Sequence, residues 1–181
     1  QKHVLRRMMS DFGRGKETSV FLIIDAKYVQ NDRVRWNRKG LLRANDNREV
    51  ERVKPVYYSV QHATSIFDSS LVALDHYPFK VNNNRPVSLY GIENQYSKEQ
   101  IAAVWFDDQI PADDNNKTSL DFTFYNGNFK HPVYVDLRTG EVFEIPDNQW
   151  SKSGSVYEFD NIPVYDSPVL IAEKSLLHLK Q

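Results

Sequence analysis

Hydrophobic and polar positions in the first 67 residues predict a helix, a strand, a long loop and a second helix. Apolar side chains over residues 2–12 recur at helical spacing. The run SVFLIID over residues 19–25 is almost continuously apolar, which predicts a strand buried on both faces, as in a parallel sheet. A polar connection over residues 26–53 leads to a second helix that begins at Pro55, a residue suited to the first helical turn. Because a lone strand cannot satisfy its own backbone groups, this piece predicts a slice of a larger α/β layer or barrel.

The second helix carries an apolar face that needs a large partner. In KPVYYSVQHATSIFD, Tyr57, Val60, Thr64 and Phe67 share one side at helical spacing. We therefore expect the strand over 19–25 and both helices to be poorly buried in this chain, unless another polypeptide or a second copy covers them.

After about residue 70 the spacing of apolar residues changes to the alternation of short strands. Leu120, Phe122 and Phe124 alternate with polar neighbours, and VYVDLRTGEVFEI predicts a hairpin with Gly140 in its turn. The predicted strands are 71–74, 79–81, 87–92, 101–106, 120–125, 133–137, 141–145, 156–160 and 168–173. Short strands at regular intervals predict an antiparallel β-sandwich. The fold prediction is thus mainly β, with an α-β-α piece at 1–68 and the sandwich at 69–181.

Composition and charge narrow the possible partners. Residues 1–67 hold 14 Lys and Arg against 7 Asp and Glu, a net charge of +7, whereas residues 68–181 hold 9 against 17, a net charge of −8. Such asymmetry can mark a nucleic-acid site, but the basic residues are scattered through a helix and a loop, so no nucleic-acid partner is expected. No apolar run approaches the ~18 residues of a membrane helix, so no membrane contact is expected. The absence of cysteine excludes disulfides and thiolate chemistry.

The order of these motifs resembles the end of a (β/α)8-barrel glycoside hydrolase of the large retaining clan A. The stretch WNRKGLLRANDNREVERVKPVYYSVQHATSIFD is similar to the segment that contains a "KGLL"-like loop and the "KPxYY" eighth helix. The resemblance makes residues 1–18 the seventh helix, 19–25 the eighth strand and 55–68 the eighth helix. HPVYVDLRTGEVFEIP and IPVYDSPVLIAEKSLL then resemble the last hairpin and final strand of the accessory β-sandwich.

The resemblance implies an enzyme that cleaves O-glycosidic bonds of poly- or oligosaccharides in the bacterial periplasm or outside the cell. Its two catalytic carboxylates, at the ends of strands four and seven, would lie before residue 1, so no catalytic residue is assigned and this chain alone is expected to be inactive. The expected partners are carbohydrate and either the remainder of the barrel or a second copy. The alternative is a stand-alone carbohydrate-binding or interaction β-sandwich module. No cofactor is implied, and no histidine spacing predicts a metal site.

Four residues are candidates for substrate binding. Asp25 ends the strand at the face where barrel active sites lie, although a cap or a salt bridge would also explain it. Tyr28 and Trp36 follow in the loop, where their rings would either stack on a sugar or pack within the loop. Trp150 lies in the polar stretch PDNQWSKSG, which predicts an exposed ring.

Overall fold

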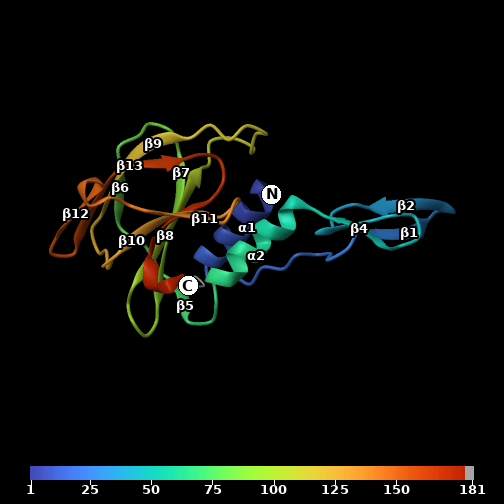
Figure 1. The fold of residues 1–181 in the computed structure, drawn as a ribbon, viewed down its shortest axis with the longest axis horizontal. Helices are drawn as coiled ribbons and strands as arrows, with labels where there is room; N and C mark the ends of the chain where they lie inside the picture. The colour runs from blue at the N-terminus through green and yellow to red at the C-terminus, as the bar shows by residue number, and fades with distance from the viewer. Residues whose placement is uncertain (178–181) are drawn as a thin grey trace.

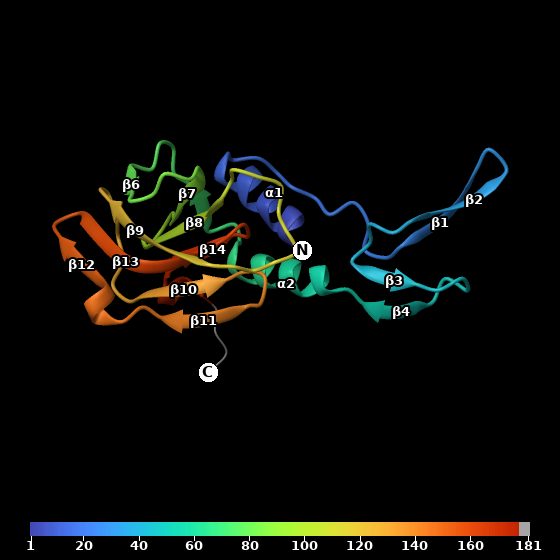
Figure 2. The same cartoon turned by 90° about the horizontal axis from the view of Figure 1, so that it is seen from above.

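Two antiparallel sheets packed face to face, with two helices on one of them, make up the body of the molecule (Figure 1). The structure is a computed structural model that describes residues 1–177. The chain is mainly β, and its sheets are consistent with the predicted β-sandwich. A long arm extends away from this body, as Figures 1 and 2 show from two directions.

The sandwich contains ten strands. The larger sheet has the order β11 (Glu141–Glu144), β10 (Pro132–Asp136), β14 (Val169–Glu173), β8 (Gln100–Phe106), β7 (Val87–Asn94) and β5 (Leu71–Ala73). The smaller sheet has the order β12 (Trp150–Ser153), β13 (Val156–Val164), β9 (Thr118–Phe124) and β6 (Phe79–Val81). One short 3₁₀ turn, Asp147–Gln149, lies between β11 and β12, and another, Lys174–Leu176, comes after β14. All nine strands predicted from alternation are present, and the hairpin around Gly140 is confirmed by β10 and β11. Strand β12 was not predicted, because WSKS lacks an apolar alternation.

Strand β8 lies at the centre of the molecule and is buried along its whole length. Ile101, Ala103 and Trp105 contribute to the core beneath the helices, whereas Ala102 and Val104 contribute to the core between the sheets. Because side chains alternate between the two faces of a strand, both faces of β8 must be apolar. This explains the unbroken apolar run IAAVWF.

Helices α1 (Lys2–Gly13) and α2 (Pro55–Ile66) cover the outer face of the larger sheet. Leu5 and Ala63 are fully buried there. The expectation that both helices would be poorly buried is therefore wrong, because the sandwich itself supplies the apolar surface that they need. The predicted face of α2 was also misplaced in part: Thr64 is exposed, and Ile66 is buried instead.

The arm comprises residues 19–53, and its part over 26–53, predicted to be a long polar loop, contains two hairpins. The first pairs β1 (Ala26–Gln30) with β2 (Arg33–Asn37), and the second pairs β3 (Leu42–Ala44) with β4 (Val50–Val53). We call residues 19–53 the hairpin arm.

The predicted strand over 19–25 is not a regular strand. Only Ile24 makes a bridge, parallel to Leu42. Phe21 is 78% exposed and Ile23 is 68% exposed. The regular strand predicted here is therefore absent, and the expectation that residues 19–25 would be poorly buried in this chain is confirmed, because no described element covers these side chains.

Candidate functional site

Asp25 lies buried at the base of the hairpin arm. Its Oδ1 accepts a hydrogen bond from the Gly40 N–H at 3.1 Å and one from the Lys54 ammonium at 2.5 Å. Its Oδ2 is 3.9 Å from Arg38 Nη1 and has no hydrogen-bond donor among the described residues. Asp25 therefore joins the start of the first hairpin to the residue that precedes α2. The salt bridge that the sequence offered as one explanation of Asp25 is present, and a contact with sugar stays a prediction.

Gly40 is required by this arrangement. A Cβ at position 40 would lie 2.4 Å from the Ile24 carbonyl carbon and 2.5 Å from the Asp25 nitrogen. These are backbone atoms that cannot move aside cheaply, so the close approach admits glycine only. The glycine of the KGLL stretch thus holds the second hairpin against the end of the 19–25 segment.

Trp36 is half-buried and already covered by cations. The Arg38 guanidinium carbon lies 4.6 Å from a Trp36 ring centroid, and the Lys27 ammonium lies 5.5 Å from one. Lys27 also pairs with Asp46, at 3.3 Å, in the turn of the second hairpin. Trp36 therefore lies on the face of the first hairpin from which Lys27 contacts the second hairpin. Its ring is partly covered by the Lys27 and Arg38 side chains.

Tyr28 lies on the opposite face of the first hairpin. It pairs across the strands with Arg35, and Gln30 pairs with Arg33. Residues two apart on a strand share a face, so these four side chains project from the same side. All four are exposed. The face therefore offers a phenol, an amide and two guanidinium groups to solvent.

The turn of the first hairpin fixes this pairing. Asn31 and Asp32 have φ of 51° and 58°, the left-handed region. Two such residues are typical of a type I′ turn, whose twist matches that of the flanking strands and sets their register.

Trp150 lies far from the hairpin arm, at the opposite end of the molecule in Figure 1, where β12 begins. Its ring stacks on Tyr157 with 4° between the planes and on Phe159 with 17° between the planes. It packs against the core between the sheets. The expected exposed loop position is therefore wrong, because Trp150 is paired with Phe159 across β12 and β13 and faces inward.

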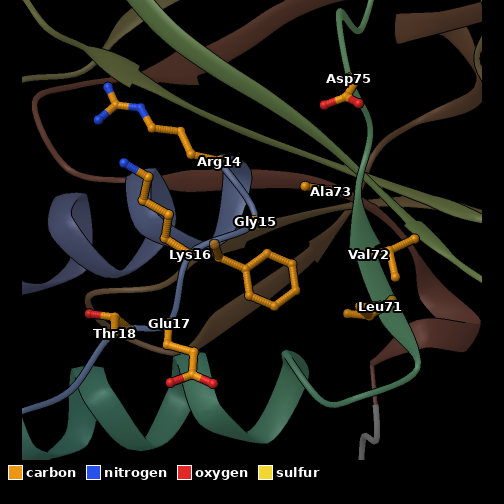
Figure 3. Close-up of a pocket in the computed structure, with 10 residues that line it drawn as sticks. Arg14, Gly15, Lys16, Glu17, Thr18, Leu71, Val72, Ala73 and Asp75 are labelled. Atoms are coloured by element: carbon orange, nitrogen blue, oxygen red, sulfur yellow. The ribbon is translucent and has the colours of Figure 1, made fainter.

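A surface groove of about 650 Å³ runs between the end of α1 and the edge strand β5 (Figure 3). Its lining includes apolar side chains of Phe12 and Leu71 together with charged Arg14, Lys16 and Asp75. None of the four candidate residues lines it. The structure thus places Asp25, Tyr28 and Trp36 on the hairpin arm, with Tyr28 and Trp36 on opposite faces of the first hairpin, and leaves Trp150 elsewhere.

Sequence reasoning missed Arg33 and Arg35. The alternation of RVRWN over residues 33–37 is typical of a strand, but the polar stretch over 26–53 was predicted to be a long loop. Across residues 1–177, three or more His, Asp or Glu side chains never gather closely enough to hold a metal ion. Within the same residues, no helix is long and apolar enough to cross a membrane.

Comparison of this chain with protein-family models, with curated proteins and with solved structures gave no match.

Proposed function

We propose that this chain is the C-terminal portion of a retaining clan A (β/α)8-barrel glycoside hydrolase that acts on O-glycosidic bonds of poly- or oligosaccharides. In this proposal α1 is the seventh helix of the barrel, the 19–25 segment is its eighth strand, and α2 is its eighth helix. The sandwich is the accessory domain, and the catalytic carboxylate pair lies in polypeptide that precedes residue 1. The parent enzyme acts in the periplasm or outside the cell.

The observation that carries the proposal is the incomplete pairing and burial of the 19–25 segment. The Leu42 N–H donates to the Ile23 carbonyl at 2.8 Å, and the Asp25 N–H donates to the Leu42 carbonyl at 3.0 Å. Both bonds lie on one edge, and alternate residues of a parallel ladder direct their groups to opposite edges. The N–H and C=O of Ile24 therefore point to the open edge, where a neighbouring barrel strand would pair.

The side chains of this segment support the same proposal. Phe21 and Ile23 are mostly exposed, although a run of this composition belongs in an apolar interior. The buried Oδ2 of Asp25 makes no hydrogen bond in the described residues, and burying a carboxylate oxygen without a donor is unfavourable. Both features are explained if further polypeptide packs on the hairpin arm.

The packing of α1 and α2 supports an accessory role for the sandwich. Both helices share a continuous core with the larger sheet. A sandwich attached in this way would be held in a fixed orientation on the barrel that the helices help to form. The sandwich then acts as a structural support.

The alternative, a stand-alone carbohydrate-binding module, receives less support. Such a module needs a row of exposed aromatic rings on one sheet face or at its loop tips. The exposed aromatic residues of the sandwich are Tyr96, Tyr125 and Phe143, which lie on separate segments, and Trp150 packs inward.

The direct test is hydrolysis. The full gene product that contains this chain, including any preceding polypeptide, is incubated with a panel of neutral and acidic polysaccharides, and released reducing ends are measured. We expect release by the longer protein and none by the 181-residue chain. Lack of hydrolysis of every polysaccharide by the longer protein would contradict the proposal, as would hydrolysis by the 181-residue chain alone.

A further inference from the structure

We infer that the outer face of the first hairpin binds an anionic sugar, carboxylated or sulfated, through Arg33, Arg35 and Tyr28. The inference rests on the proposed function, because it names the substrate class for the site that follows the 19–25 segment. It concerns the face of β1 and β2 that is turned away from Trp36.

The composition of this face is that of a polar ligand site. The cross-strand pairs Tyr28 with Arg35 and Gln30 with Arg33 are adjacent on one side of the hairpin. Directly opposed residues have Cβ atoms about 5 Å apart. The phenol ring and two guanidinium groups therefore fit within the span of one or two sugar rings, with the Gln30 amide beside them as a hydrogen-bond donor and acceptor.

No carboxylate engages either arginine among the described residues, whereas two other cations of the hairpin arm are paired. Lys27 pairs with Asp46 at 3.3 Å, and Arg43 pairs with Glu51 at 2.9 Å. A guanidinium presents parallel N–H groups that match the two oxygens of a carboxylate or sulfate. Arg33 and Arg35 are thus exposed, unpaired and suited to an acidic ligand.

The position of the hairpin agrees with a substrate contact. Strand β1 begins at Ala26, directly after Asp25, the last residue of the segment assigned to the eighth barrel strand. Active sites of such barrels are built at the carboxyl ends of the strands. The first hairpin would therefore stand at the mouth of the site.

An anionic sugar, carboxylated or sulfated, fits this face better than a nucleic acid. Nucleic-acid binding draws much of its affinity from several Lys and Arg contacts to phosphates along the backbone. This face has two unpaired arginines on strands of five residues each. The opposite face carries Val29 and Val34, which are exposed apolar residues unsuited to a phosphate backbone.

The test measures binding to the 181-residue chain by titration calorimetry at low salt. Polygalacturonate is compared with its fully methyl-esterified form, and dextran sulfate with dextran, so that the two members of each pair share a sugar backbone and only one carries anionic groups. A single-stranded 20-mer of DNA is the third arm. We expect at least tenfold tighter binding to one charged polymer than to its neutral counterpart, and that polymer identifies carboxylate or sulfate as the ligand group. Binding should weaken as NaCl is added.

The variant Arg33→Gln/Arg35→Gln should lose at least tenfold in affinity for that charged polymer. The matched variant Lys98→Gln/Lys152→Gln removes the same charge from exposed positions on the sandwich and should change affinity less than twofold. All four side chains are exposed, so circular dichroism should show both variants folded.

Three results would overturn the inference: failure to bind either charged polymer more tightly than its neutral form, equal effects of the two double variants, or tighter binding to DNA than to both polysaccharides. If the longer protein hydrolyses polysaccharides while any of these results holds, the inference fails and the proposed function stands. If the longer protein hydrolyses none, the proposed function fails whatever the binding result.

Discussion

The Lys2 ammonium lies 2.5 Å from Asp166 Oδ1, and less than a tenth of either side chain is exposed. Lys2 also donates to the Ala112 carbonyl at 2.9 Å, and the Ala112 N–H donates to Asp166 Oδ2 at 2.6 Å. Arg6 reinforces the contact by donating to the Asp166 carbonyl at 2.9 Å. The first turn of α1 is thus fixed to the loop after β8 and to the segment between β13 and β14.

Replacing Asp166 by Asn should destabilise the whole chain by about 3–5 kcal/mol, because Lys2 is left as a buried charge without its partner. Urea unfolding of the purified chain measures this. Arg7→Gln is the control, since its pair with Asp11 spans 3.5 Å on the surface and Arg7 is 73% exposed. Its cost should stay below ~1 kcal/mol. Equal costs for the two variants would show that the buried pair does not hold α1 in place.

The sandwich was predictable from the sequence, whereas the contacts of the helices and the arm were not. Alternation at Leu120, Phe122 and Phe124 reports burial directly, because a strand with one covered face must alternate. Lys2 carries no such signal, since its partner Asp166 is 164 positions away. Helical periodicity showed that α1 and α2 need a partner, but it cannot say which surface supplies it.

The candidate site was predictable only in part, for a related reason. The sequence allows Asp25 either a sugar contact or a salt bridge, and the salt bridge becomes visible only once the position of Lys54 is known. Trp150 was predicted to be exposed from its polar neighbours, but the cross-strand partner Phe159 determines its direction. Arg33 and Arg35 become a shared face only once the hairpin register is known.

Leu5→Ala should lower the free energy of unfolding by about 2–5 kcal/mol, because Leu5 is fully buried and its removal leaves a cavity between α1 and the larger sheet. Unfolding followed by tryptophan fluorescence and by far-UV circular dichroism should remain one coincident transition, since helices and sandwich share a core. Ile110→Ala, at a position that is 78% exposed, should change stability by less than ~0.5 kcal/mol. Separate transitions for helix and sandwich would contradict the shared core.

Glu99 should give the chain a pH-dependent part of its stability. The Lys130 ammonium donates to Glu99 Oε1 at 2.8 Å, and the Ser175 hydroxyl donates to Oε2 at 2.7 Å. These hydrogen bonds, that from Lys130 first, lower the pKa of Glu99 below its usual value. A lowered folded-state pKa stabilises the fold above the unfolded-state pKa of ~4.3, and this contribution is lost as the pH falls through the folded-state value.

The stability difference between the wild-type chain and Glu99→Gln should therefore be largest above about pH 5 and shrink below about pH 4.3. Urea unfolding at a series of pH values measures it. Lys130→Gln should show the same trend, because it removes the main cause of the lowered pKa. A difference that stays constant or grows at low pH would contradict this account of Glu99.

The proposal that further polypeptide covers the hairpin arm is tested most directly by hydrogen–deuterium exchange over residues 19–25. The amides of this segment are measured in the 181-residue chain and in the full gene product that contains it. We predict rapid exchange in the 181-residue chain, where one edge is open and Phe21 and Ile23 are exposed, and exchange slower by about 100-fold or more in the longer protein. Strong protection already present in the 181-residue chain as a monomer, or rapid exchange in both proteins, would contradict the assignment of this segment to a barrel strand.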